Sequence, residues 1–356
     1  MFKKINFFKN IDINKNKNNN SIKTITNYAN THNVITNNNL DEILENYNVE
    51  NICIVNDPQN LEFINNKINK IYVINLNSDN IRKMYIEIIM KKMNINYNLI
   101  RVNKVNDSPY NITNGEFGCY LSHLWCLNDA KKNNYNEIII FEDDIVFHKN
   151  FKQMFYNIFS NNHFDFVLLG AYDKFLSTLN CKNIRDNMYY PKCKFILGAH
   201  AIYYSKLGIE YTLTYKKNKP IVAYDADLIN IFHYFNKTST VCYPNLIVAE
   251  LSTTNLKHDY GFINANNEKR YYNKTQINFN FTDYYFVYLW FFSLNNHMQF
   301  KDKTTFEDYV ETILNYYYKD DLDRKNEIKN RIDFTFFTNE DYQKMQHSIT
   351  YIEDIS

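Results

Sequence analysis

Glu142, Asp143 and Asp144 form a run of three consecutive carboxylates, the pattern in this sequence that most suggests chemistry. They follow Ile138-Ile-Ile-Phe141, an apolar, β-favouring run typical of a strand buried on both faces. Like charges at the end of such a strand repel one another and are costly to desolvate, so a bound divalent cation would offset both penalties. Oxygen ligands favour Mg²⁺ or Mn²⁺, ions that usually keep open positions for substrate phosphates. We therefore expect a metal-dependent enzyme that acts on a phosphorylated donor; the alternative is an exposed acidic turn.

A second segment, Gly115-Glu-Phe-Gly-Cys-Tyr-Leu-Ser-His-Leu124, combines glycines with three polar side chains. Glycine permits close backbone approach, and the chain has only 6 glycines where average usage would give roughly 25. The segment presents Glu116, Ser122 and His123 at the beginning of an expected helix, where free N–H groups suit a phosphate or nucleotide oxygen. Alternatively, Ser122 and His123 are buried polar residues whose hydrogen bonds are satisfied within the core.

Strands and helices alternate along the stretch that carries these residues. Such alternation indicates an α/β fold whose parallel or mixed sheet is covered by helices on both faces. In open sheets of this kind, ligands bind just outside the carboxyl ends of the strands, where the acidic run lies. Ser78 or Asp79 is expected to cap the helix after the first strand. The strands are expected at residues 70–76, 98–102, 137–141, 164–170, 194–204 and 238–248, and the helices at 80–93, 117–132, 151–159 and 225–234.

Composition divides the chain into three parts. Residues 1–66 are Asn-rich and partly flexible, although 40–46 fit a short helix and 51–56 fit an edge strand. Residues 67–260 hold the alternating strands and helices and form the expected catalytic domain. Residues 261–356 change to an aromatic-rich stretch followed by polar, helix-prone sequence, which we interpret as a mostly helical C-terminal extension.

The 356 residues carry a formal net charge of +1, which gives no indication of a nucleic-acid or membrane partner. The six cysteines show no CxxC or zinc-type spacing, and the N-terminus lacks the uninterrupted apolar core of a signal peptide. The most apolar run, 284–294, is about half the ~20 residues of a membrane helix. We expect a protein without membrane spans that stays in the cytoplasm with reduced thiols. The Asn-rich bias suits an AT-rich genome, including that of a virus in a host-cell cytoplasm.

In their order along the chain, these motifs resemble glycosyltransferase family 25, which includes lipopolysaccharide and lipooligosaccharide galactosyltransferases and the procollagen galactosyltransferases. Two features depart from the family pattern: Ala226 separates the acids Asp225 and Asp227, and the first helix keeps Arg82 as its single arginine. The similar segments are Asn75-Leu76, Gly115–His123, Phe141–Val146, Leu168–Gly170, Gly198–Gly208, Ile221–Leu228, Tyr243-Pro244 and Leu251-Ser252.

The resemblance implies a Rossmann-like fold of the glycosyltransferase A type, with a mixed, mainly parallel sheet that binds a UDP-sugar together with Mn²⁺ or Mg²⁺. We expect Asp144 to bind the metal directly, and Glu142 or Asp143 to contact the metal or the ribose. His258 is expected to complete the metal shell or contact the diphosphate, with a surface position as the alternative. The remaining expected donor-binding residues are Asn75, Leu76, Arg82, Glu116, Ser122 and His123.

A transfer to a hydroxyl also needs a base, and a carboxylate within hydrogen-bond reach is the usual one. Asp225 and Asp227 are the candidates, because they lie in a later element expected to face the metal across the crevice. The alternative is an acid at a helix N-terminus, stabilised by the helix dipole. The sequence leaves open which of the two aspartates is the base.

The resulting hypothesis is an inverting hexosyltransferase, with UDP-galactose as the donor and a hydroxyl of a glycan or of hydroxylysine in a collagen-like protein as the acceptor. A UDP-glucose-dependent enzyme is the first alternative, and an inactive binding protein with the same fold is another. A metal-dependent phosphohydrolase or nuclease is disfavoured, because two-metal hydrolases need more acids and histidines than the strand ends provide.

Overall fold

The computed structural model describes residues 40–59, 61–171, 181–185, 188–191, 196–249 and 320–331, together with positions 285, 311, 315, 335–336 and 338–341. His258 and most of the expected C-terminal extension lie outside these residues. None of the described helices is both long and apolar enough to cross a membrane. The helices are α2 (Leu40–Glu45), α3 (Phe63–Lys67), α4 (Asn80–Lys92), α5 (Asn114–Lys132), α6 (Phe151–Phe159), α7 (Lys206–Lys217), α8 (Leu228–Tyr234) and α10 (Leu322–Arg331).

Within the described residues, the centre of the fold is a nine-stranded sheet in the order β1-β3-β2-β4-β9-β6-β10-β8-β7. Strands β3, β2, β4, β6, β10 and β7 run in one direction, and β1, β9 and β8 run in the other. The expected α/β, Rossmann-like fold with a mixed sheet is therefore confirmed. The strands are β1 (Val49–Val55), β2 (Lys70–Leu76), β3 (Tyr97–Val102), β4 (Glu137–Glu142), β5 (Ile145–Phe147), β6 (Phe166–Leu168), β7 (Cys181–Arg185), β8 (Met188–Pro191), β9 (Ala201–Ser205), β10 (Ser239–Cys242) and β11 (Ile247–Ala249).

The order of the strands changes direction at β2. From β2 the chain runs through α4 to β3 on one side, and then through α5 to β4 on the other side of β2. The carboxyl ends of β2 and β4 are adjacent in the sheet, because Ile74 pairs with Glu142. Open α/β sheets bind ligands outside the carboxyl ends of strands at such a switch point. The acidic run therefore follows β4 at the place where this fold class holds its ligands.

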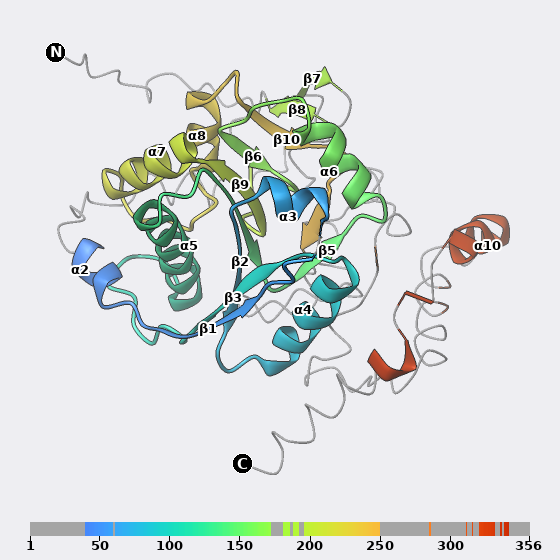
Figure 1. The fold of residues 1–356 in the computed structure, drawn as a ribbon, viewed down its shortest axis with the longest axis horizontal. Coiled ribbons are helices and arrows are strands. Elements are labelled where there is room, and N and C mark those ends of the chain that lie inside the picture. The colour runs from blue at the N-terminus through green and yellow to red at the C-terminus, as the bar shows by residue number, and fades with distance from the viewer. Residues whose placement is uncertain are drawn as a thin grey trace, which may run out of the picture. The chain divides into compact units, whose positions relative to one another are not determined.

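Helices cover both faces of the sheet. Helices α2, α5, α7 and α8 lie on one side, and α3, α4 and α6 lie on the other (Figure 1). The side chains of β4 alternate between these faces, as the pleat of a strand requires. Phe141 packs on the side of α6, whereas the next residue, Glu142, reaches α5.

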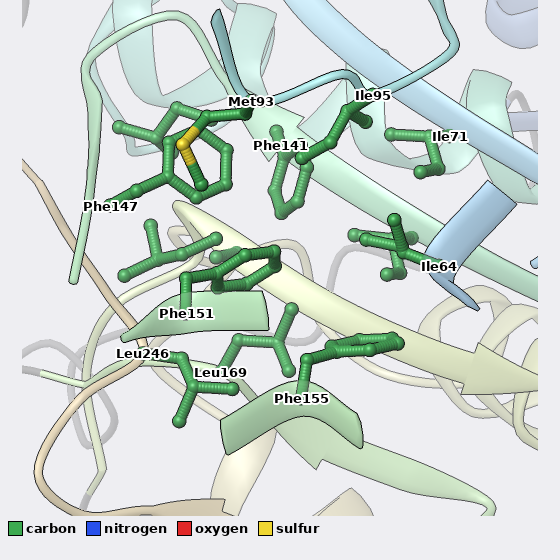
Figure 2. Close-up of a cluster of buried hydrophobic side chains, with 14 of the residues drawn as sticks. Ile64, Ile71, Met93, Ile95, Phe141, Phe147, Phe151, Phe155, Leu169 and Leu246 are labelled. Atoms are coloured by element: carbon green, nitrogen blue, oxygen red, sulfur yellow. The ribbon is translucent and has the colours of Figure 1, made fainter. Parts of the chain in front are cut away.

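An aromatic cluster that includes Phe141, Phe147 and Phe151 forms part of the buried core on the α6 side of the sheet (Figure 2). The ring of Phe147 makes edge contacts with Phe141, at a centroid distance of 6.0 Å, and with Phe151, at 4.8 Å. Such aromatic pairs each contribute about 0.5–1.5 kcal/mol beyond their burial. Since Phe141 and Phe147 stand on either side of Asp143 and Asp144, the cluster fixes both ends of the turn that carries these acids.

The expected strand 238–248 is wrong as a single element. Residues Ser239–Cys242 form β10 in the large sheet, whereas Ile247–Ala249 form β11, which pairs with β5 in a separate two-stranded sheet. Pro244 lies between the two and cannot donate a hydrogen bond to a sheet ladder, so the strand ends before it. The expected helix 225–234 is also shorter, because it begins at Leu228.

Gly170 lies where the main chain of β11 passes the end of β6. A Cβ added there would lie 1.8 Å from the carbonyl oxygen of Ile247 and 2.8 Å from Nε2 of His200. We expect Gly170→Ala to lower the free energy of unfolding by about 3 kcal/mol, the upper end of overpacking costs, because a backbone atom cannot yield as a side chain can. Urea unfolding measures this change.

Gly118→Ala is the matched control for that substitution. Its Cβ would meet Cγ2 of Val105 at 3.5 Å, an ordinary contact, and alanine in a helix gains about 0.5–1 kcal/mol over glycine. Equal unfolding midpoints for the two alanine variants would contradict the steric argument.

Candidate active site

The three consecutive carboxylates do not converge on one point. Glu142 is the last residue of β4, and Asp143 and Asp144 form the turn to β5. Glu142 contacts α5 through His123, whereas Asp143 contacts α4 through Arg82. The acidic run is therefore divided between the two faces of the sheet, and each acid has its own surroundings.

Asp143 is buried and held by two side chains. Nη1 of Arg82 lies 2.7 Å from Oδ1 of Asp143, and Nδ2 of Asn75 donates to Oδ2 at 2.6 Å. Burial raises the pKa of Asp143, and the positive charge of Arg82 counters part of that rise. Arg82 also lies 4.0 Å from Asp144. The sequence suggested that a metal cation must offset the repulsion between the carboxylates. The positive charge of Arg82 already offsets part of that repulsion.

We expect Arg82→Met to lower the free energy of unfolding by about 3–5 kcal/mol, because it leaves the buried Asp143 carboxylate without its charged partner. Lys83→Met is the control. Lys83 faces solvent beside Glu87, with the charged atoms 3.7 Å apart, and exposed pairs of this kind contribute about 0–1 kcal/mol. Urea unfolding of both variants measures the difference, and a similar loss in each would refute the role of the buried pair.

Arg101 of β3 is a site residue that the sequence reasoning missed. It is buried, and its guanidinium donates to Oδ1 of Asn75, to the carbonyl of Asn77 and, at 2.8 Å, to Oδ1 of Asn80. The signal was an arginine within the strand expected at 98–102. Arg101 fixes the amide of Asn75, and the other end of that amide holds Asp143.

Leu76, an expected donor-binding residue, contributes to the site through its main-chain carbonyl group. Its carbonyl oxygen accepts the N–H of Asp79 at 2.9 Å, in the turn between β2 and α4. Asp79 in turn caps α4, as expected, because its carboxylate accepts the N–H of Arg82 at 3.0 Å. These hydrogen bonds hold the end of β2 against the start of α4, beside the acidic turn.

Glu142 faces a histidine and a cysteine from α5. Nε2 of His123 lies 3.1 Å from Oε1 of Glu142, and Sγ of Cys119 lies 3.3 Å from the same oxygen. Burial raises the pKa of Glu142, but the hydrogen bond and charge of His123, with the charge of His200, outweigh it and lower the pKa. The ring of His123 stacks on Tyr224 with 4.2 Å between centroids. Glu142 is therefore poised as an ionised acid in a fixed orientation.

The expectation that Ser122 and His123 lie at the beginning of a helix is wrong. Helix α5 begins at Asn114, because Thr113 and Glu116 form a capping box that starts the helix earlier. Ser122 and His123 therefore lie in its interior and offer no free N–H group to a phosphate. The hydroxyl groups of Ser122 and Tyr47 share a hydrogen bond of 2.8 Å. The carboxylate of Glu116 accepts the N–H of Thr113 at 2.9 Å as part of the capping box.

The two later aspartates have different partners. Asp225 accepts the N–H of Gly198 at 3.0 Å, and burial raises its pKa, with the charge of Glu142 adding to the rise. Asp227 forms an ion pair with the buried Lys216. Asp227 occupies the N-cap position of α8 but makes no capping hydrogen bond with its side chain. The negative charge of Asp227 is thus neutralised by Lys216, whereas the charge of Glu142 acts on Asp225 and raises its pKa.

Lys216 of α7 was not found from the sequence. Its ammonium donates to the carbonyl of Tyr224 at 2.7 Å and pairs with Asp227, so it holds both residues that flank Asp225 and Ala226. Only 1% of the Lys216 side chain is exposed. A lysine near the end of an amphipathic helix gives no sequence signal for such a role. Lys216 fixes the segment that carries Asp225.

Cys119 lies against one carboxylate of the switch point, since its Sγ is 3.3 Å from Oε1 of Glu142. Burial raises the pKa of the Cys119 thiol well above its ordinary value, and the charges of Glu142, Asp225 and Asp144 raise it further. The charges of carboxylates from the end of β4, from the following turn and from the segment before α8 thus all raise the pKa of one thiol. Hard oxygen donors of this kind fit Mn²⁺ or Mg²⁺. His258, the third expected ligand, lies outside the described residues.

Comparisons with known proteins match the same region. Residues 68–224 match the family profile described as "Glycosyltransferase family 25 (LPS biosynthesis protein)". A putative glycosyltransferase of Haemophilus influenzae (strain ATCC 51907 / DSM 11121 / KW20 / Rd) is 28% identical over 184 residues, which cover 46% of this chain and 64% of that protein. The match thus spans less than two thirds of the Haemophilus protein. The family match includes Asn75 and the acidic run and ends one residue before Asp225.

Two solved structures are similar at low sequence identity. The first is a glycosyltransferase involved in the glycosylation of the major capsid of PBCV-1, with 10% identity and a TM-score of 0.33, covering 52% of this chain and 94% of that one. The second is A197 from STIV, with 12% identity and a TM-score of 0.27, covering 54% of this chain and 100% of that one.

Proposed function

We propose that this chain, whose residues 68–224 match the profile of glycosyltransferase family 25, transfers a hexose from a UDP-sugar to an acceptor hydroxyl. The observation that carries the proposal is the position of Glu142 and Asp144 at the carboxyl end of β4, at the switch point of the sheet, with Asp225 close enough for the charge of Glu142 to raise its pKa. Acids at this place in an α/β sheet suit a donor that carries phosphates and a metal.

Asp144, Glu142 and His258 would hold a Mn²⁺ or Mg²⁺ ion, which would supply positive charge where the leaving diphosphate gains negative charge. The protein's own part is to hold these ligands in place. His123 orients Glu142, and the aromatic cluster at both ends of the turn fixes Asp144. Both ligands are therefore positioned before the donor arrives, which lowers the cost of binding it.

Asp225 is the base that we assign to the transfer. As the acceptor oxygen bonds to the anomeric carbon, the bond from that carbon to the diphosphate breaks on the opposite face and the hydroxyl proton passes to Asp225. A carboxylate whose pKa burial has raised accepts a proton more readily than an exposed one. A single displacement with one base inverts the anomeric configuration. Galactose is the proposed sugar and glucose the alternative; a glycan or a collagen-like hydroxylysine is the proposed acceptor.

A phosphohydrolase or nuclease is less consistent with this site. Two-metal hydrolases place their ions about 3.5–4 Å apart between converging acids. Here Asp143 points away from Glu142 and pairs with Arg82, so one acid of the run is already neutralised. The remaining acids suit one metal better than two.

Release of UDP tests the proposal. The full chain is incubated with UDP-galactose, UDP-glucose and UDP-N-acetylglucosamine in turn, with Mn²⁺ or with EDTA, and free UDP is measured with and without glycan or hydroxylysine peptide acceptors. We expect UDP release that requires the metal and rises with one acceptor class. A phosphodiester substrate serves as the parallel assay. Cleavage of that substrate without UDP release from any donor would refute the proposal in favour of a hydrolase.

A further inference from the structure

Cys119, His123 and Glu142 form a cluster that the proposed transfer reaction does not fully use. Cys119 and His123 lie four residues apart on α5, so they share one face of the helix. Oε1 of Glu142 lies 3.3 Å from Sγ of Cys119 and 3.1 Å from Nε2 of His123, and the three ligand atoms all lie within 4.8 Å of one another. The atoms therefore form a compact triangle of one sulfur, one nitrogen and one oxygen.

Two sides of the triangle, 3.3 Å and 3.1 Å, match the ligand spacing on one face of a tetrahedral zinc site. Zinc binds sulfur at about 2.3 Å and nitrogen or oxygen at about 2.0–2.2 Å, so neighbouring ligand atoms of a tetrahedron lie about 3–4 Å apart. A thiolate beside an imidazole selects Zn²⁺ over Mg²⁺ or Mn²⁺, which prefer oxygen. Three protein ligands leave a fourth position for water, as in open zinc sites.

We propose that Cys119, His123 and Glu142 bind a thiophilic divalent ion of the Zn²⁺ class, and that this ion inhibits the enzyme by withdrawing Glu142 from the donor metal. The imidazole is already held in place, because His123 is fully buried and its ring stacks on Tyr224. Cys119 and Glu142 are only partly buried, which gives the ion a path from solvent. Binding replaces the thiol proton, which passes to the solvent, by a bond from sulfur to the metal.

The binding itself does not depend on the proposed function, whereas the inhibition does. Glu142 is one of the residues that we assign to the Mn²⁺ or Mg²⁺ ion of the donor complex. A zinc ion held against α5 uses the same carboxylate, so the two ions compete for it. Zinc would then act as an inhibitor at concentrations far below those of Mn²⁺.

Cobalt spectroscopy tests the binding. The reduced full chain is titrated with Co²⁺, and we expect the near-ultraviolet charge-transfer band of a thiolate–cobalt bond, displaced by Zn²⁺. Cys119→Ser should abolish the band, and Cys126→Ser should retain it, because Cys126 lies on the same helix outside the cluster. Losing a ligand should weaken Zn²⁺ binding more than about a hundredfold, since losing an outer-shell partner costs about 10–100-fold. A band that survives in Cys119→Ser would overturn the proposal.

Two further measurements keep the test independent of folding and of activity. In the wild-type chain, Zn²⁺ should protect Cys119 from alkylation by N-ethylmaleimide, as followed by peptide mass spectrometry, and unchanged alkylation would refute the site. In the UDP-release assay with Mn²⁺, micromolar Zn²⁺ should inhibit the wild type and Cys126→Ser equally and Cys119→Ser much less. Zinc binding without inhibition would overturn the competition for Glu142. A chain without transferase activity would still answer the binding question.

Discussion

Replacing Asp144 by Asn will lower the turnover number for UDP release by about a thousandfold, the size of effect that follows the loss of one electrostatic contact to a transition state. The substitution keeps the shape of the side chain but removes the charge that would face the donor metal. Asp144 is buried in a turn whose two ends are fixed by the aromatic cluster, so the fold should persist. The turnover number is measured at saturating donor and Mn²⁺.

Asp143→Asn is the matched comparison, since it makes the same change one residue earlier. Asp143 is engaged by Arg82 and Asn75, so we expect this variant to lose mainly stability, visible in thermal unfolding. Calorimetry of UDP binding with Mn²⁺ separates the two, because only Asp144→Asn should weaken the dependence on the metal. Full turnover in Asp144→Asn, or equal loss of metal dependence in both variants, would remove Asp144 from the metal site.

Local signals in the sequence predicted the elements that position these acids. The strand at Lys70–Leu76 and the helix at Phe151–Phe159 have the expected bounds. In both elements, a short apolar segment is bounded by polar residues. The secondary structure that the local sequence favours is also the one that packs in the core. Asp79 was one of two expected caps, and it caps α4.

Two expected elements had wrong bounds, because a second local signal in the same segment was overlooked. The start of α5 was expected at Phe117, although Thr113 and Glu116 already have the spacing of a capping box. Reading that box would have placed Ser122 and His123 inside the helix. The strand expected at 238–248 was wrong because apolar residues continue past Pro244, while the hydrogen-bond ladder does not.

Other parts of the site could not be predicted from one sequence, because they depend on contacts between distant residues. The ion pair between Lys216 and Asp227 joins α7 to the start of α8, and the contact between Cys119 and Glu142 joins α5 to β4. No local pattern encodes either contact. The sequence identified Asp225 and Asp227 as a pair, and only the structure distinguishes them.

Asp225→Asn is expected to lower transfer to the acceptor by about 10²–10⁴-fold, the usual contribution of a general base. Binding of UDP with the metal should change little, so the loss should appear in the turnover number. The acid must be ionised to accept the proton, and burial raises its pKa. Activity of the wild type should therefore be full at neutral pH and fall as the pH drops through a value above the ordinary 3.9 or so of aspartate. The residual activity of Asp225→Asn should lack this acid limb.

Asp227→Asn gives the opposite pattern, because its carboxylate neutralises Lys216 rather than facing the acceptor. Leaving that lysine without its charged partner should lower the free energy of unfolding by about 3 kcal/mol. The folded fraction of Asp227→Asn should keep most of its turnover and the acid limb of its pH profile. Transfer rates and urea unfolding are measured on both variants. If Asp227→Asn loses the acid limb while Asp225→Asn retains it, the roles of the two aspartates are reversed, and the base lies on the side that Lys216 holds.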